Sequence, residues 1–353
     1  MYTIIQLVRL GIGHHADPIP EDINWAVIEA MAIKQGLSAV VLDGIEKLND
    51  SIQPPKELLL QWIGNTLQSY EYRYELYRRA IAELAEWHNS NGYKMMVLKG
   101  YACSLNWPKP DHRPCGDINI WQFGRQLEAD NTLFRDKGIK IDKSEQHHTI
   151  FYWQDFMVEN HYDFLDVHHH QSNVELEQIL KELGQDDTNC VILYGVKVYL
   201  PSPNLHALFL LKHAMAHFAA TEISLRQLLD WAFFVKEWGK KIDWQWLEDV
   251  LGRFGMLDLY YIFNAICIDD LGFSKASFHE LRKVDPGLKN KVFTEILSPV
   301  SFGKMPNRLI KRVVWKFRRW KTNEWKHKLC YKESMWSAFW NGVWNHLLKP
   351  ASI

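Results

Sequence analysis

The chain has few cysteines and no excess of charge of either sign. Its five cysteines are spread over 353 residues, are odd in number, and form no C-x-x-C pair. This spacing argues against a disulfide framework and against a structural zinc site built on cysteine. The formal net charge is −1, so the chain as a whole has no electrostatic preference for nucleic acid or for an acidic membrane. We therefore expect a protein of a reducing compartment, the cytoplasm.

Long hydrophobic runs, internal repeats and low-complexity segments are also missing. The N-terminal stretch MYTIIQLVRLGIGHH has a short apolar run and no small-residue cleavage site, which is not typical of a secretory signal. The most apolar helix candidate, LHALFLLKHAMAHFAA, is interrupted by Lys212, His213 and His217, and it is shorter than the roughly 20 residues that cross a bilayer. With 47% hydrophobic and 24% charged residues, the composition is that of a globular protein with a sizeable core.

The periodicity of apolar residues changes twice along the chain. Helical spacing dominates before residue 92 and after residue 203, and between them short apolar stretches alternate with turn residues. We predict helices over 21–49, 54–92 and 124–138, strands over 93–98, 117–121, 148–153 and 161–170, and a helical bundle from 203 onward. The fold class is therefore α+β: a small mixed β-sheet core (93–202) flanked by an N-terminal helical region (1–92) and a C-terminal helical domain (203–353).

The densest cluster of chemically active residues lies in MMVLKGYACSLNWPKPDHRPCGDINIW, residues 95–121. Side chains at i and i+2 of a strand share one face, so Asp117 and Asn119 project together. By the same argument Asp166 and His168 share a face of the strand predicted over 161–170. If the two strands are neighbours, three oxygen ligands converge, as Mg²⁺ prefers in phosphoryl or nucleotidyl transfer.

The loop before Asp117 adds further candidates for phosphate binding. Gly100 would let the backbone approach a phosphate closely. Lys99 or Arg113 would add positive charge beside it. For Asp117 and Asn119, the alternative is that they only cap the turn after Gly116 through side-chain to backbone hydrogen bonds.

Several motifs in the same order resemble the uncharacterised nucleotidyltransferase-like family of bacterial proteins. These are LKG, WPKP, Arg113 and GDIN, then LDVHHH, then LKHAMAHFAATEISLRQLLDWAFFV, which together cover about residues 90–240. The resemblance implies the DNA-polymerase-β-like nucleotidyltransferase fold, which binds a nucleoside triphosphate with two Mg²⁺ ions and transfers a nucleotidyl group to an acceptor hydroxyl. On this basis the catalytic residues are Asp117 and Asp166, and the metal ligands are Asp117, Asn119 and Asp166. The substrate-binding residues are Lys99, Gly100, Arg113, His168, His213, His217 and Arg226.

Two positions depart from the family pattern. Asn119 stands where the second acid of a D-x-D pair is expected, and Tyr101 follows Gly100 where the wider superfamily often has serine. An amide oxygen can coordinate Mg²⁺ but brings no negative charge. The alternative function is therefore a catalytically degenerate module that binds a nucleotide or a partner.

The helical segment after 203 allows a second interpretation of its polar residues. His213 and His217 lie at i, i+4, which suits a metal or a substrate phosphate, but core histidines are the alternative. Arg226 and Asp230 have the same spacing and could form only an intrahelical ion pair.

Two other groups of residues attract attention for their composition. His168–His170, with His147, His148 and His161, could bind a transition metal, but neighbouring strand residues face opposite sides and no H-E-x-x-H spacing accompanies them, so no zinc or iron site is expected. Residues 308–328 alternate basic residues with tryptophan, which can bind nucleic acid or an anionic membrane. An amphipathic helix docked on the bundle is the favoured interpretation.

Overall fold

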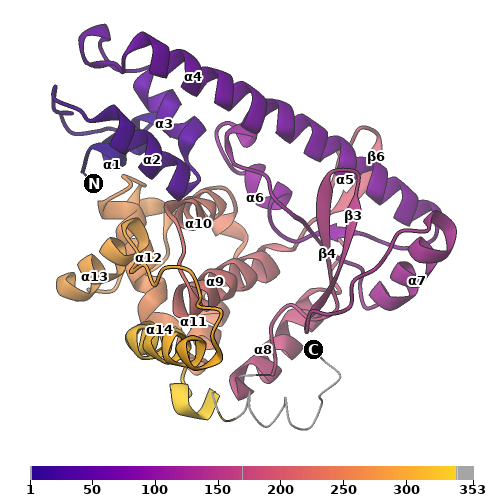
Figure 1. Ribbon diagram of the computed structural model, residues 1–353. Helices are drawn as coiled ribbons and strands as arrows, with labels where there is room; N and C mark the ends of the chain where they lie inside the picture. The colour runs from indigo at the N-terminus through magenta and orange to yellow at the C-terminus, as the bar shows by residue number, and fades with distance from the viewer. Residues whose placement is uncertain (1, 169, 339, 341–353) are drawn as a thin grey trace.

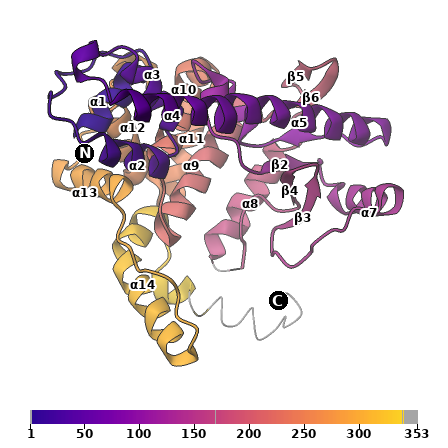
Figure 2. The same ribbon diagram turned by 45° about the horizontal axis from the view of Figure 1, so that its top comes forward.

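A long helical rod spans two lobes in the computed structural model, which describes residues 2–168, 170–338 and 340 (Figure 1). One lobe is helical and contains both the N-terminal and the C-terminal helices. The other contains the sheet and the helices that flank it. Figure 2 shows the same rod crossing above both lobes. The α+β class expected from the sequence is confirmed.

The rod consists of α4 (Lys56–Thr66), a π-helical turn η2 (Leu67–Tyr72) and α5 (Arg73–Ser90). The single helix predicted over 54–92 is thus confirmed, with a wider turn at its middle. The first half contacts the N-terminal helices, where the indole Nε1 of Trp62 donates to the Ser38 carbonyl at 2.9 Å. The second half covers the sheet, where the Tyr77 hydroxyl donates to the Asp117 carbonyl at 2.9 Å.

The sheet has six strands in the order β3-β4-β2-β1-β6-β5. β1 pairs antiparallel with β2 and parallel with β6, and β2 pairs parallel with β4, so the sheet is mixed as predicted. The hairpin of β5 and β6 was not predicted. The bounds are β1 (Met96–Val97), β2 (Ile118–Trp121), β3 (His148–Trp153), β4 (Phe156–His161), β5 (Cys190–Leu193) and β6 (Val196–Tyr199).

The strand predicted over 161–170 is wrong. β4 ends at His161, and residues 162–168 and 170 leave the sheet before α8 begins. Instead of pairing with a strand, the Phe164 and Leu165 amides donate to the Glu177 carboxylate on α8, at 3.0 and 2.9 Å. The strand that pairs with β2 is β4, which ends where the predicted strand was to begin. β4 follows β3 after a turn at Gln154–Asp155.

Hydrophobic side chains pack on both faces of the sheet. On one face, α5 buries Ile118 and Ile120 together with β3, β4 and β6 side chains. On the other face, Met96 and Trp121 join the large core that the N-terminal and C-terminal helices share. The domain boundary predicted at 92/93 therefore separates α5 from the sheet face that α5 covers.

The remaining helices form the N-terminal cap, the flanks of the sheet and the C-terminal bundle. The bundle predicted over 203–353 is confirmed for the residues that the structure describes, and 339 and 341–353 lie outside them. The bounds are α1 (Tyr2–Gly11), α2 (Trp25–Gln35), α3 (Ser38–Ile45), α6 (Tyr101–Ser104), α7 (Gln126–Lys137), α8 (Gln171–Leu183), α9 (Pro203–Ala220), α10 (Leu225–Trp238), α11 (Trp244–Arg253), α12 (Leu257–Asp269), α13 (Pro286–Leu297) and α14 (Leu309–Cys330).

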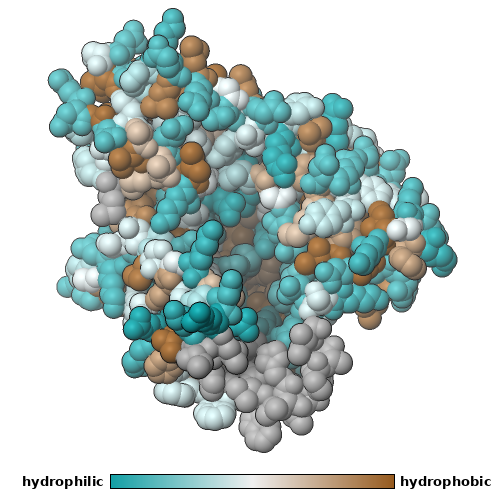
Figure 3. Space-filling view, viewed as in Figure 1, coloured by the Kyte–Doolittle hydropathy of each residue, from teal (hydrophilic) through white to brown (hydrophobic). Residues whose placement is uncertain are grey.

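The basic segment 308–328 lies largely in α14, which docks on the bundle. The Lys326 ammonium is buried against Glu295 at 2.5 Å, and Asn323 donates to the Ala220 carbonyl at the end of α9 at 3.2 Å. Hydrophilic side chains gather over α14 on the outer surface (Figure 3). The exposed basic residues of α14 are Lys311, Arg312, Lys316, Arg318, Lys321 and Lys328. Within the described part of the chain, no helix combines the length and apolarity needed to cross a membrane.

Candidate active site

Asp117 and Asn119 lie on the same side of β2, as the alternation predicts. Ile118 and Ile120 point into the core beneath α5, which leaves Asn119 on the opposite face with its side chain 1% exposed. The Asn119 amide Nδ2 donates to the Asp117 carboxylate at 2.6 Å, and its Oδ1 lies 3.0 Å from the His161 imidazole Nε2. The two residues therefore form one polar group rather than two separate turn caps.

A second acid reaches this group from the neighbouring strand. β2 and β4 run parallel with Asn119 opposite Glu159, so both side chains stand on the same face. The Lys99 ammonium lies 3.9 Å from Asp117 Oδ2 and 4.0 Å from Glu159 Oε2. Two carboxylates, one just before β2 and one on β4, thus converge on one cation. The signal for Glu159 was present as Glu159-Asn160-His161, a second acid-x-His sequence that follows the alternating Phe156 and Val158.

Asp166 and His168 occupy a different place from the one predicted. They lie in the connection between β4 and α8, where the Asp166 carboxylate accepts the His168 amide at 2.8 Å. The Asp166 carbonyl accepts from the Asn173 side chain at 2.6 Å. The strand pairing that was to bring Asp166 beside Asp117 does not exist, and Glu159 takes that position in the sheet.

Glu159 is held ionised by its surroundings. Burial alone would raise the pKa of its carboxyl, but the positive charges of His161, Lys99 and His148 outweigh burial and lower the pKa to about 2. His161 Nε2 and His148 Nε2 lie 3.6 and 3.9 Å from the carboxylate oxygens. The site therefore offers an anionic oxygen ligand throughout the physiological pH range.

α9 brings the predicted pair His213 and His217 to the same site. His213 Nε2 lies 3.3 Å from the Lys99 ammonium, and the two imidazole rings meet edge to face at 4.5 Å. Burial, followed by repulsion from Lys99, lowers the pKa of His213 well below its usual value. A neutral His213 can accept a hydrogen bond from Lys99 and orient its ammonium toward the two acids.

Arg226, on the first turn of α10, is the cation beside the site with unused donor capacity. Its Nε is buried and has no hydrogen-bond partner among the described residues. Burial, then repulsion from Arg113, lowers the pKa of the guanidinium, while Asp230 and Asp117 partly offset that effect. An arginine with an unpaired donor near a carboxylate cluster is suited to bind an anionic ligand.

Arg113 does not have the phosphate-binding position expected for it. Its Nε and NH2 donate to the Asp230 carboxylate at 2.7 and 2.9 Å, and its NH1 donates to the Pro114 carbonyl at 3.1 Å. The side chain is 7% exposed. Arg113 therefore ties the loop to α10, and it takes the acid that the sequence had paired with Arg226.

Gly100 is required by the backbone at the start of α6. Its φ of +62° lies in the left-handed region, and a Cβ at this position would stand 2.5 Å from the Tyr77 hydroxyl. The same hydroxyl holds the Asp117 carbonyl. Glycine thus lets Lys99 and Asp117 approach each other around Tyr77. Contact of Gly100 with a phosphate stays a prediction.

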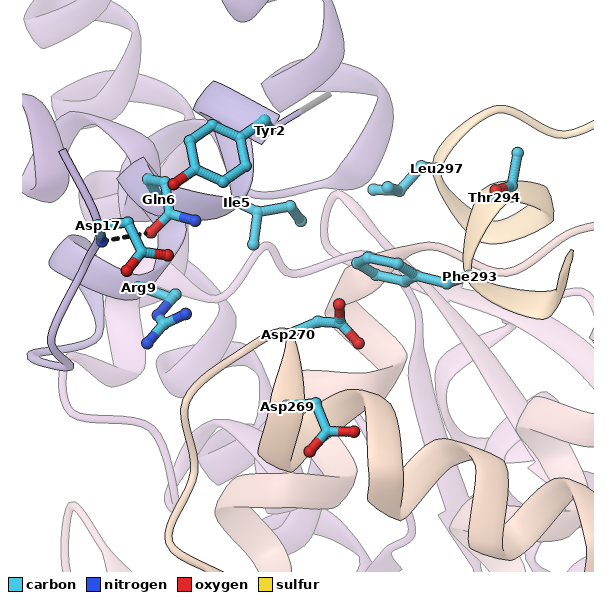
Figure 4. Close-up of a pocket in the computed structure, with 10 residues that line it drawn as sticks. All are labelled: Tyr2, Ile5, Gln6, Arg9, Asp17, Asp269, Asp270, Phe293, Thr294 and Leu297. Carbon is cyan, nitrogen blue, oxygen red and sulfur yellow. Dashed lines mark hydrogen bonds between the residues drawn. The ribbon is translucent and has the colours of Figure 1, made fainter. Parts of the chain in front are cut away.

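A separate hollow of about 310 Å³ lies in the helical lobe (Figure 4). Several of its polar groups already have partners: Gln6 accepts from the Asp17 amide at 2.8 Å, and Arg9 donates to the His15 carbonyl at 2.6 Å. Asp269 and Asp270 both pair with Lys289. It shares no residue with the carboxylate cluster, so we place the candidate site at the sheet.

A mixed sheet with helices on both faces, with one acid on β4 and another just before β2 beside a lysine, is consistent with a nucleotidyltransferase core. The chain belongs to the uncharacterised nucleotidyltransferase family, whose model matches residues 21–267. Among solved structures it is similar to an antigenic nucleotidyltransferase-like protein from Paracoccidioides brasiliensis, with 14% identity, 57% of this chain and 96% of that chain covered, and a TM-score of 0.36. No curated protein matches the chain.

Proposed function

We propose that the protein binds a nucleoside triphosphate with Mg²⁺ and transfers its nucleotidyl group to an acceptor hydroxyl. The observation that carries this proposal is the convergence of Asp117 and Glu159 on the Lys99 ammonium, at 3.9 and 4.0 Å. Two acids that meet at one cation can hold another cation at the same place. Membership of the nucleotidyltransferase family supports the same reaction.

The residues present fit Mg²⁺, which takes carboxylate and amide oxygens. Asp117 and Glu159 supply two anionic ligands, and Asn119 can supply a third oxygen. A half turn of the Asn119 amide would place its Oδ1 beside Asp117, where Nδ2 now lies at 2.6 Å. It would also direct Nδ2 toward His161 Nε2, which accepts it in the tautomer whose Nδ1–H donates to the Asp163 carbonyl, 3.2 Å away. When bound, Mg²⁺ supplies charge neutralisation to the phosphate oxygens.

The chain's own cations have a distinct role in this proposal. When a metal takes the position between the acids, the Lys99 ammonium is free to bind a phosphate oxygen while His213 holds its direction. Arg226 offers its unpaired Nε to the same triphosphate, and His217 lines the approach from α9. A location in the cytoplasm is consistent with all five cysteines being free thiols.

A second candidate function rests on Asn119. With an amide in place of the second acid, the site has two anions instead of three, so it binds a metal more weakly. The protein would then bind a nucleotide, or a partner, and would transfer no nucleotidyl group. Measurement of product, separate from measurement of binding, distinguishes the two functions.

The test measures the melting temperature with each nucleoside triphosphate, with and without Mg²⁺, because a ligand that binds the native state raises it by mass action. Asp117→Asn and Glu159→Gln should both abolish the Mg²⁺-dependent rise. Asp166→Asn is the matched control and should retain it. Pyrophosphate release in the presence of hydroxyl-bearing acceptors then separates transfer from binding. A rise that survives Glu159→Gln but is lost in Asp166→Asn would overturn the assignment.

A further inference from the structure

Three histidines gather at the end of the β3–β4 hairpin, beside the carboxylate cluster but outside its ligand set. His148 opens β3, His161 closes β4, and the two are directly paired across the antiparallel ladder. His147 precedes β3 and lies outside the strand. Each residue offers one ring nitrogen within 4.8 Å of those of the other two.

The alternation rule that argued against this cluster does not apply to it. His147 and His148 would face opposite sides if both belonged to the strand, but only His148 does. The His147 carbonyl accepts the Tyr162 and Asp163 amides, at 3.1 and 3.0 Å, which turns the residue back over the hairpin end. Its ring then meets His148 at 4.4 Å and His161 at 5.8 Å.

The burial and hydrogen bonding of these histidines are those of a cation-binding site. His148 is 7% exposed, and its Nδ1 is buried without a hydrogen-bond partner among the described residues. A buried imidazole nitrogen with no partner is costly unless something binds it. Burial first, and then mutual repulsion, lower the pKa of His147 to about 4. Metals bind the neutral form of imidazole, through the lone pair of a ring nitrogen.

We propose that His147, His148 and His161 bind one divalent transition-metal ion of the zinc class. Three imidazoles and no thiolate suit Zn²⁺, Co²⁺ or Ni²⁺ rather than Mg²⁺, which prefers oxygen ligands. Three protein ligands leave the fourth tetrahedral position open to water or to a substrate atom, as in sites that act on a ligand. Glu159 lies within 4 Å of two of the rings, so the ion sits next to the proposed triphosphate site.

This inference does not depend on the proposed function, and the two can fail separately. The zinc-class ion uses nitrogen atoms of the hairpin end, whereas Mg²⁺ uses oxygen atoms of Asp117, Asn119 and Glu159. His147 has no part in the triphosphate site. His147→Ala should therefore remove binding of the zinc-class ion and leave Mg²⁺-dependent binding of the triphosphate.

The experiment titrates Zn²⁺ and Co²⁺ into chelator-treated full-length protein by calorimetry and follows the visible absorption of bound Co²⁺. The wild type should bind one ion per chain with the spectrum of a nitrogen-ligated tetrahedral site. Loss of an outer-shell partner weakens a metal site about 10–100-fold, so loss of a ligand in His147→Ala should weaken binding by more than about 100-fold. His15→Ala, at an exposed histidine in the N-terminal loop, is the matched control and should bind as the wild type does.

Two further measurements keep the outcome decisive. Asp117→Asn should still bind Zn²⁺ with unchanged affinity, which separates this site from the oxygen site. The wild-type Co²⁺ spectrum decides the question even if His147→Ala does not fold. Absence of one-to-one binding by the wild type, or equal Zn²⁺ affinity of a folded His147→Ala, would overturn the proposal.

Discussion

Replacing Asn119 by aspartate tests the oxygen site at its weakest ligand. In the free protein the amide donates to Asp117 at 2.6 Å, and aspartate would turn this bond into a contact between two carboxylates. Two like charges about 4 Å apart repel by about 4 kcal/mol at an effective dielectric constant of 20. The His161 Nε2, which lies 3.0 Å from Asn119 Oδ1, can donate a hydrogen bond to the new carboxylate and offset part of this repulsion. The lost hydrogen bond to a charged group leaves a net destabilisation of about 2 kcal/mol.

A divalent cation should reverse that loss. The added anion attracts Mg²⁺ by several kcal/mol before desolvation is subtracted, so we expect Asn119→Asp to bind it at least about 30-fold more tightly, which is about 2 kcal/mol. Urea denaturation in chelator and in Mg²⁺ measures both effects on one variant. Asp117→Asn serves as the opposite control, because it should lose the Mg²⁺ response. Equal Mg²⁺ stabilisation of wild type and Asn119→Asp would refute the metal site and assign Asn119 to the turn.

Three further predictions concern the charges around the site. Arg226→Ala should weaken triphosphate binding about 10–100-fold, because it removes a charged hydrogen-bond donor. It should leave the melting temperature of the free protein nearly unchanged. A loss of stability without a loss of triphosphate affinity would contradict this prediction. Arg113→Met should cost about 3–5 kcal/mol in urea denaturation, since it removes the ion-pair partner of the buried Asp230 and leaves it the hydrogen bond from the Trp107 indole. Adding Asp230→Leu should recover part of the loss. Burial raises the pKa of Glu177 to about 7, above its unfolded value, so its contribution to stability is full at low pH and falls as the pH rises through about 7. Glu177→Gln should therefore have a flatter stability profile than the wild type between about pH 4.5 and 7, and parallel profiles would count against the shift.

The helices were predictable because each has a long apolar stripe and recognisable ends. α7 ends at Gly138 in a left-handed conformation, as the sequence suggested, and α9 to α12 follow the helical period after 203. The β5–β6 hairpin was missed because its four-residue strands, VKVY among them, are too short to stand out from the turns around them.

The site was predictable in part, for a physical reason that differs from residue to residue. Asp117 and Asn119 follow directly from alternation in a single strand. The position of the second acid depends on which strands are neighbours, and two acid-x-His sequences lie within ten residues of each other. The choice between them is made by Glu177, which takes the amides of Phe164 and Leu165 and prevents a strand there. That contact is long-range, so local pattern could not reveal it. The contact between Arg113 and Asp230 also joins residues far apart in the sequence, so local pattern could not reveal it either.

The π-helical turn at Leu67–Tyr72 accommodates about one residue more than an α-helical turn in the middle of the rod. Each residue of an α-helix advances the side chains by about 100°, so this extra residue sets the rotational phase of α5 against α4. With it, Trp62 faces Ser38 while Tyr77 faces Asp117. Deleting one residue from the turn would restore regular winding and swing Tyr77 about a quarter of a circle away from the carbonyl it holds. The angular position of the candidate site relative to the N-terminal helices is thus set by chain length in a segment that contributes no ligand.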